Sequence, residues 1–355
     1  MTDWLTTFGG AERVLSQLHV LYPDAPIYAS VFDRRGLPRE TDGWDLRSTV
    51  LQRLPGAKRY SRALLPFMPA AFARLELAAY DCVISTSSAF SKNLSTRAGV
   101  PNVCYCFTPP RYLWDLRDAY APGLAGRVSA PAVRWLRTRD QAAAARVTRF
   151  LAISQTVAER IRRIYDRDCK VIYPPVEVDR IAPTGSAPED FYLVVSRLVG
   201  YKRVDLAVQA CSRTGRRLVV VGAGPDLGRL RRMAGPTVEF SGALADGEVA
   251  ELYARCRAFL FPGIEDFGIA PVEAQAAGRP VIAFGLGGAT ETVVDGVTGL
   301  FFHEQSVAAL TAAMERSEQM EFDTASCRAN ARRFDAGLFR SRIAAEILDA
   351  VQHRV

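Results

Sequence analysis

Residues 262–273 read P-G-I-E-D-F-G-I-A-P-V-E, and this stretch decides the fold. It follows an apolar run at residues 258–261, A-F-L-F, which predicts a buried strand, and it leads into a predicted helix over residues 271–277. Gly268 lets the backbone pass close to a bound group, and the free amides of residues 268–270 lie where a helix start presents its positive end to phosphate. The stretch therefore predicts a strand-to-helix turn that faces an anionic ligand.

Two carboxylates flank this turn at different depths. Glu265 precedes the helix, whereas Glu273 lies inside it, where a carboxylate can accept two hydrogen bonds from a ribose diol. An ordinary helix cap with one exposed and one buried glutamate is the alternative. The pieces that follow favour the ligand site, because G-R-P-V-I-A at residues 278–283 and G-G-A-T-E-T-V-V-D-G-V-T-G at residues 287–299 extend the pattern.

Together these pieces resemble the retaining nucleotide-sugar glycosyltransferases of family four, and among them the mannosyltransferase-like subgroup. The resemblance extends from residue 3 to about residue 302. It is carried further by D-W-L-T-T-F-G-G-A-E-R-V-L (3–15), S-S-A-F-S-K (87–92), T-P-P-R-Y-L-W-D (108–115), V-I-Y-P-P-V (171–176) and S-R-L-V-G-Y-K-R (196–203). It implies the GT-B architecture, an α/β fold in which two Rossmann-like parallel-sheet domains face a cleft.

The domain organisation follows from the resemblance and from the alternation of elements. We expect an acceptor-side domain at residues 1–175, a linker at 176–190, a nucleotide-sugar-binding domain at 191–335, and a helix at 336–355 that crosses back to the first domain. Strand and helix patterns alternate in the second half, which favours a parallel sheet covered on both faces. Relatives begin with an apolar strand before the D-W-L piece, so we expect either a true start upstream of Met1 or a first domain that lacks this strand.

Local signals predict further elements. The serines of residues 87–92 predict the start of a helix after a strand, and Ser154 predicts the cap of a helix over residues 155–165. Residues 166–168, D-R-D, spell the metal-binding motif of another glycosyltransferase architecture. Because they lie between a helix end and a strand, we interpret them as a turn. With three scattered histidines, the sequence predicts no metal site and no cofactor beyond the sugar nucleotide itself.

Carried over motif by motif, the resemblance assigns a donor site. Arg197 and Lys202 would hold the diphosphate, Glu273 the ribose and Glu265 the sugar hydroxyls, and the first-domain glycine loop would face the diphosphate. The expected catalytic residues are Glu265, Arg197 and Lys202. The expected donor-binding residues are Gly10, Phe107, Arg197, Lys202, Glu265, Phe267, Gly268, Ile269, Ala270 and Glu273.

Phe107 departs from the pattern. Relatives carry a histidine just before the T-P-x-R-Y-x-W piece, and this histidine contacts the donor sugar, whereas this sequence has phenylalanine. An apolar ring leaves a C6 hydroxyl unpaired but tolerates a methyl group, so the substitution favours a 6-deoxyhexose donor. The alternative is that Phe107 turns into the core while Tyr105 or Arg111 supplies the polar contact.

Composition and charge limit the partners. The 355 residues are 49% hydrophobic with a mean hydropathy of +0.01, and neither a leader nor a membrane-spanning run is evident, which predicts a cytoplasmic protein with reduced cysteines. The net charge of +7 gathers in residues 1–180, which hold 26 Lys and Arg against 17 Asp and Glu. Without a nucleic-acid-binding motif, this charge favours an anionic membrane or a diphosphate-linked acceptor.

Residues 53–74 sharpen the membrane hypothesis. Basic residues alternate there with Leu64, Leu65, Phe67, Met68 and Phe72, as in an interfacial segment, so we expect peripheral association with the inner face of the membrane. A charged loop followed by a core helix is the alternative.

Three functions remain open on the sequence. The leading interpretation is hexose transfer, of mannose or a 6-deoxyhexose, from a nucleotide sugar to a glycan, a lipid-linked acceptor or a small molecule. The alternatives are a nucleotide-sugar epimerase of the same architecture and a catalytically degenerate glycosyltransferase-like subunit.

Overall fold

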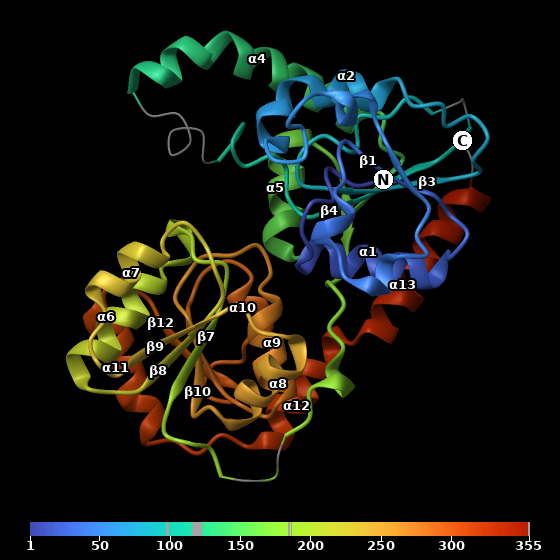
Figure 1. The fold of residues 1–355 in the computed structure, drawn as a ribbon. Coiled ribbons are helices and arrows are strands. Elements are labelled where there is room, and N and C mark those ends of the chain that lie inside the picture. Colours follow the sequence, from blue (N-terminus) through green and yellow to red (C-terminus); the bar gives the residue numbers. More distant parts are fainter. Residues whose placement is uncertain (97–98, 116–122, 184, 186, 354–355) are drawn as a thin grey trace. The chain divides into compact units, whose positions relative to one another are not determined.

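The computed structural model describes residues 1–96, 99–115, 123–183, 185 and 187–353 (Figure 1). The chain forms two compact units. The first unit combines Met1–Tyr173 with Phe339–Val355, and the second is Pro174–Leu338. Each is a parallel-sheet α/β structure, so the predicted fold class is confirmed.

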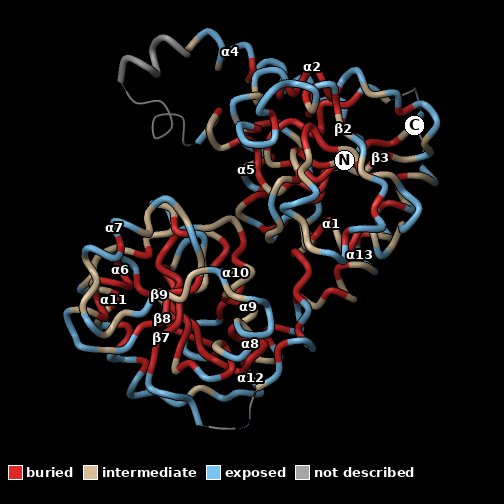
Figure 2. Tube along the Cα trace, in the orientation of Figure 1, coloured by how far each residue is buried: buried red, intermediate tan, exposed pale blue. Residues whose placement is uncertain are grey.

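The second unit is built on six parallel strands in the order β12-β11-β10-β7-β8-β9. The strands are β7 (Tyr192–Val195), β8 (Leu218–Val221), β9 (Val238–Gly242), β10 (Ala258–Phe261), β11 (Val281–Phe284) and β12 (Gly299–Phe302). β8, β10 and β11 are buried at every residue, as expected for continuous apolar strands covered on both faces (Figure 2). The strand order reverses between β7 and β10, and the carboxyl ends flanking such a reversal are where ligands bind in open α/β sheets.

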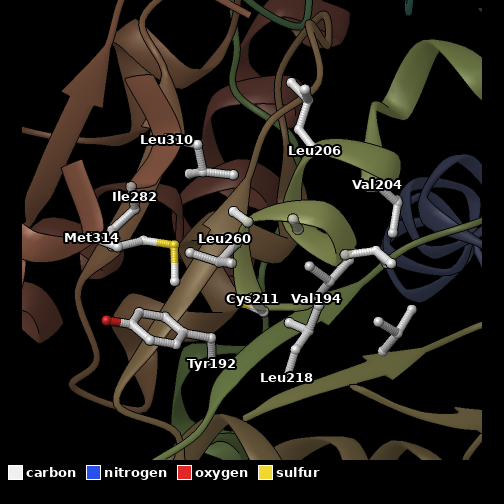
Figure 3. Close-up of a cluster of buried hydrophobic side chains, with 14 of the residues drawn as sticks. Tyr192, Val194, Val204, Leu206, Cys211, Leu218, Leu260, Ile282, Leu310 and Met314 are labelled. Atoms are coloured by element: carbon white, nitrogen blue, oxygen red, sulfur yellow. The ribbon is translucent and has the colours of Figure 1, made fainter. Parts of the chain in front are cut away.

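Helices cover this sheet in two groups. The helices are α6 (Val204–Thr214), α7 (Leu227–Met233), α8 (Asp246–Arg255), α9 (Ile269–Ala276), α10 (Ala289–Thr292), α11 (Val307–Glu318) and α12 (Thr324–Ala331). α6 packs against α11, and α9 packs against α8 and α12. Under α6 and α11 lies a buried cluster in which Leu206, Leu310 and Met314 meet strand residues such as Leu218 and Leu260 (Figure 3).

The first unit holds a four-stranded parallel sheet in the order β3-β4-β5-β6 and a parallel pair, β1-β2. The strands are β1 (Ile27–Ala29), β2 (Leu46–Ser48), β3 (Val83–Ser87), β4 (Asn102–Cys106), β5 (Arg149–Ala152) and β6 (Cys169–Val171). Thr2 forms parallel bridges with both Ala29 of β1 and Thr86 of β3. The residues at the start of the chain thus lie between the two sheets, through single bridges in place of a regular strand.

The helices of the first unit are α1 (Gly10–Leu21), α2 (Met68–Ala73), α4 (Gly123–Ala145), α5 (Gln155–Tyr165) and most of α13 (Ala336–Gln352). Short 3-10 helices add η1 (Arg34–Gly36), η2 (Arg39–Thr41), η3 (Val50–Arg53), η4 (Ser61–Phe67), η5 (Val178–Arg180), η6 (Gly200–Lys202) and η7 (Arg332–Phe334) across both units. No helix in the described part of the chain has the length and apolar character needed to cross a bilayer.

Helix α13 closes the first unit. Arg149 contacts Glu346 at 2.8 Å and Asp349 at 2.5 Å, and Lys170 contacts Glu346 at 2.7 Å. The preceding residue Asp335 pairs with Val176 in the second unit. The chain therefore passes between the units twice, after Tyr173 and after Leu338.

The local predictions met different outcomes. Ser154 caps α5 by accepting the amide of Val157 at 3.1 Å, as predicted. Residues 166–168 form the predicted turn, since Asp166 ends α5 with a φ of 52°. The prediction of a helix that starts at residues 87–92 is wrong, because the structure has an irregular loop there.

The amides that a helix start would leave free are taken by a distant carboxylate. Asp3, 4% exposed, accepts the backbone N–H groups of Ser88 at 2.6 Å, Ala89 at 2.8 Å, Phe90 at 2.8 Å and Ser91 at 2.7 Å. A buried carboxylate needs such donors, and satisfying it fixes the loop that follows β3.

Candidate active site

Loops that follow β7, β10 and β11 meet at the carboxyl edge of the second unit's sheet. A Cβ added to Gly263, in the loop after β10, would lie 2.8 Å from the backbone of Lys202 in the loop after β7. A Cβ added to Gly288 would lie 2.2 Å from the backbone of Phe267, and the amide of Gly288 donates to Glu265 O at 2.8 Å. These glycines allow backbone to pack on backbone, which explains the glycine-rich pieces of the sequence pattern.

An ion pair joins two of the predicted catalytic residues. The ammonium of Lys202, at the end of η6, contacts the carboxylate of Glu265. Their side chains are 16% and 20% exposed, so both are held in place yet open to a ligand. The loops after β7 and β10 thus place the ammonium of Lys202 and the carboxylate of Glu265 in contact at this edge of the sheet.

Arg197 is the second predicted cation of this edge. It follows β7 and is exposed, and its guanidinium has neither a hydrogen bond nor an ion pair within the described ranges of the chain. A guanidinium fork in this state is suited to bidentate binding of a phosphate.

Helix α9 begins at the same edge. Gly268 is its N-cap with a φ of 95°, a conformation that favours glycine, and no side chain of the described residues caps the helix. The first-turn amides at Ile269 and Ala270 therefore resemble a phosphate-binding helix start.

The second carboxylate, Glu273, lies within α9 and is half-buried. Tyr253 of α8, 1% exposed, donates its hydroxyl to Glu273 Oε2 at 3.0 Å. Tyr253 was missed by the sequence analysis, because it lies 20 residues from Glu273 on the apolar face of another helix.

Phe267 is placed differently from the other predicted donor-binding residues. Its side chain is 3% exposed, and its ring packs edge-on against Phe334 at 5.4 Å between centroids. The ring is part of the core, so only its backbone lies at the edge of the site.

Buried amides hold α9 in position. Gln275 Nε2 donates to Pro271 O at 3.1 Å and to Thr292 O at 2.8 Å, and Asn330 Nδ2 of α12 donates to Thr292 O at 2.8 Å and to the amide oxygen of Gln275. Thr292 belongs to the G-G-A-T-E-T piece. This piece therefore anchors the helix that carries Glu273.

The remaining predicted residues, Gly10 and Phe107, lie in the first unit. Gly10 opens α1, and Phe107 follows β4, half-buried, with its amide donating to Ser87 O at 2.8 Å. Its ring packs edge-on against Tyr105 at 5.7 Å. Tyr105 is 0% exposed and donates its hydroxyl to Ile172 O at 2.8 Å, so it is not available to a sugar.

Near Gly10, the carboxyl group of Glu12 belongs to the capping box at the start of α1. Glu12 Oε2 accepts the amide of Gly9 at 2.9 Å, and burial raises the pKa of Glu12 to about 7. Between the unfolded value of 4.5 and about 7 the folded state holds a proton that the unfolded state releases, so stability falls as pH rises through this window.

We expect Glu12→Gln to remove this dependence. The amide oxygen of glutamine still accepts the Gly9 amide, but no charge has to be desolvated. The variant should be about 1–3 kcal/mol more stable than the wild type at pH 8 and equally stable at pH 5. Denaturant unfolding at pH 5, 6, 7 and 8 measures this, and a stability difference that is the same at all four values would contradict it.

No group of three His, Cys, Asp or Glu side chains is placed to hold a metal ion in the part of the chain that the structure describes. Asp168 of the D-R-D turn is fully exposed and lies 3.9 Å from Arg162.

Two family models match consecutive parts of the chain. "Glycosyltransferase Family 4" matches residues 8–180, and "Glycosyl transferases group 1" matches residues 179–334. Among curated proteins, the GDP-mannose-dependent alpha-(1-6)-phosphatidylinositol monomannoside mannosyltransferase of Mycolicibacterium smegmatis is 33% identical over 170 residues, which cover 40% of this chain and 44% of that protein.

A GDP-mannose-dependent alpha-mannosyltransferase of the same species is 31% identical over 209 residues, 57% of this chain and 54% of that protein. The chain thus spans about half of the length of these curated relatives. Among solved structures, Anabaena Alr3699/HepE in complex with UDP has a TM-score of 0.73 at 18% identity, with 98% of both chains covered. The lipopolysaccharide outer core galactosyltransferase WaaB in its apo form has a TM-score of 0.66 at 16% identity, again with 98% of both chains covered. At these identities the likeness is one of fold.

Proposed function

This chain belongs to the family-four glycosyltransferases, and from that premise we propose that it transfers a hexose of the mannose class from a nucleoside diphosphate sugar to a glycan, glycolipid or small-molecule acceptor. The transfer proceeds with retention at the anomeric carbon and without a metal ion. The observation that carries the proposal is the contact of Lys202 with Glu265 beside the start of α9.

Each residue of this edge has a role in the proposed reaction. Arg197 and Lys202 bind the diphosphate, and the amides of residues 268–270 neutralise the charge that grows on it as the bond to the anomeric carbon breaks. Glu265 accepts hydrogen bonds from the sugar hydroxyls. The acceptor oxygen forms the new bond to the anomeric carbon, and its proton passes to the leaving phosphate oxygen.

Nucleotide binding depends on Glu273 in this proposal. We expect Glu273→Ala to cost about 1–3 kcal/mol of nucleoside diphosphate affinity, because two charge-assisted bonds to the ribose are lost. Calorimetry with GDP and UDP measures the change. Glu251→Ala is the matched control, since Glu251 is an exposed carboxylate of the neighbouring helix α8. Equal affinities for the two variants would remove Glu273 from the site.

The donor sugar is proposed from two observations. The relatives named above are GDP-mannose-dependent, which favours a mannose-type sugar. Phe107 is half-buried at the end of β4, where its apolar ring suits a methyl group at C6 better than a hydroxyl. We therefore propose mannose or, preferentially, its 6-deoxy counterpart.

A donor screen tests the proposed function. Wild type and Phe107→His are assayed with GDP-mannose, a GDP-6-deoxyhexose, UDP-glucose and dTDP-rhamnose, and both release of nucleotide and transfer to an acceptor are measured. The wild type should favour the 6-deoxy donor and the variant should shift toward mannose. Turnover of none of these donors, or isomerisation without any acceptor, would overturn the transferase proposal.

The acceptor side is proposed to meet an anionic membrane. Leu54, Tyr60 and Phe67 are 45%, 60% and 61% exposed, and exposed basic residues lie among them (Arg53, Lys58, Arg59 and Arg74). Two apolar residues of the predicted segment, Met68 and Phe72, are instead fully buried in the core, because α2 packs its apolar face inward. Arg62 lies outside the residues whose side chains are described.

Charge reversal should release the protein from vesicles. We expect Arg53→Glu with Arg59→Glu to reduce binding to vesicles of anionic lipid by about 2 kcal/mol or more, since each basic residue near such a surface contributes about 1 kcal/mol. Co-sedimentation at low salt measures this. Arg213→Glu with Arg232→Glu gives the same change of charge on exposed residues of the second unit. If both pairs reduce binding equally, only net charge matters and the proposed surface is wrong.

A further inference from the structure

We propose that Asp140 is a positioning residue, whose buried carboxylate fixes the loop at residues 108–115, and that the activity of the enzyme depends on the position of this loop. The inference rests on the proposed function in one respect, namely that the loop faces the acceptor or the sugar. Asp140 lies in α4, is 0% exposed and belongs to none of the predicted site motifs.

Asp140 joins four segments of the first unit. Its Oδ1 contacts the ammonium of Lys92 at 2.6 Å, in the loop after β3. Its Oδ2 accepts the indole N–H of Trp114 at 2.9 Å, in the loop after β4, and the hydroxyl of Tyr165 at 2.7 Å, at the end of α5. Lys92 also donates to Ala89 O at 2.9 Å, which ties the loop after β3 to the same point.

The rest of the loop is held just as closely. Asp115 contacts Arg160 and Arg163 of α5, each at 2.7 Å, and Arg160 also donates to the hydroxyl of Thr108 at 2.6 Å. Arg137 of α4 donates to Leu113 O at 2.8 Å and lies over the Trp114 ring at 4.8 Å. The two ends of the loop are thus fixed against α4 and α5.

Stability alone does not account for a buried charge pair of this kind. Lys92 and Asp140 are 1% and 0% exposed, and taking two charges out of water offsets most of their attraction. Apolar residues of similar volume at such positions are often as stable or more stable. What an apolar pair cannot do is accept the Trp114 and Tyr165 donors and so set the position of the loop.

The sequence adds an independent reason. Lys92 ends the S-S-A-F-S-K piece, and Trp114 and Asp115 end the T-P-P-R-Y-L-W-D piece. The donor-site assignment gave neither motif a role. The structure brings both motifs to one carboxylate. β3 and β4 are neighbouring parallel strands, so the loops that follow them start side by side at the carboxyl edge of the sheet. Both of these loops contact Asp140.

The test separates position from stability. Lys92→Met with Asp140→Leu replaces the charged pair by apolar side chains of similar shape. We expect a melting temperature within about 5 °C of the wild type, unchanged nucleotide affinity in the second unit, and a fall in kcat/KM for the acceptor of about 10- to 100-fold. Faster hydrogen exchange at residues 108–115 should accompany this fall.

A second, milder variant tests the same proposal in case the double variant does not fold. Trp114→Phe removes the indole N–H and one of the two fused rings, and it should give a smaller loss of kcat/KM, about 3- to 10-fold, with the same faster exchange in the loop. Trp135→Phe is its control, because Trp135 is an exposed residue of the same helix α4. Full activity in the folded double variant, or in Trp114→Phe, overturns the proposal. If the wild type transfers no sugar at all, the proposed function fails, and loop exchange alone then decides the role of Asp140.

Discussion

Replacing Lys202 by Met is expected to lower kcat by about 100- to 1,000-fold, the cost of removing one preorganised group that stabilises developing charge. Its ammonium contacts Glu265, and in the proposed reaction it also meets the leaving diphosphate. The variant loses that cation and leaves Glu265 as an uncompensated negative charge beside the phosphates. Both effects disfavour departure of the nucleotide.

Lys170→Met is the matched control for this substitution. Lys170 also pairs with a glutamate, Glu346 at 2.7 Å, but its side chain is 65% exposed and it lies in β6, an edge strand of the first unit's sheet. An exposed pair of this kind contributes at most about 1 kcal/mol to stability, and kcat should be unchanged. Steady-state kinetics on both variants decide the matter. A kcat for Lys202→Met within about threefold of the wild type would show that the cation takes no part in the chemistry.

The second large effect is expected from a single methyl group. In Gly288→Ala the new Cβ would lie 2.2 to 2.4 Å from Cα, O and C of Phe267, and a backbone cannot give way as a flexible side chain can. The loop that carries Glu265 must therefore shift. A displacement of about 1 Å at a reacting centre can cost about 100-fold in rate, and overpacking adds about 1–3 kcal/mol of lost stability.

Gly247→Ala separates this effect from the general consequence of a glycine substitution. Gly247 lies in the first turn of α8, and a Cβ there would have no neighbour within 4 Å. Alanine in a helix is favoured over glycine by about 0.5–1 kcal/mol, so this variant should be slightly more stable and fully active. Gly288→Ala should therefore lose both activity and stability, whereas Gly247→Ala should keep its activity and gain slightly in stability, as measured by kinetics and denaturant unfolding. Retained activity in Gly288→Ala would mean that the position of residues 265–267 is not critical.

Sequence signals were sufficient where the structure is decided locally. Continuous apolar runs such as A-F-L-F predicted the strand Ala258–Phe261, and the cap at Ser154 predicted the start of α5. The alternation of such elements in the second half predicted a parallel sheet, and the GT-B likeness of the whole chain agrees with it. Side-chain size, charge and capping act within a few residues, and a sequence pattern records them directly.

Prediction was insufficient where a distant residue decides. The helix predicted at residues 87–92 does not form, and the amides of residues 88–91 instead donate to Asp3, which lies 85 residues away from Ser88. Tyr253 and Asp140 are missed for the same reason, since each acts on a segment about 20 or more residues away. Phe267 shows the converse case, in which a residue inside a ligand-binding motif points its ring into the core.

The return of α13 to the first unit bears on how the chain folds during its synthesis. The second unit is continuous, Pro174–Leu338, and all its strands have left the ribosome before Phe339 does. The first unit needs Glu346 and Asp349, which pair with Arg149, although its other residues are made earliest. The usual order, in which N-terminal domains complete their folding first, is therefore reversed here. An apolar face of the nascent first unit, which residues such as Phe339 and Ile343 later cover, stays exposed while about half of the protein is still being made.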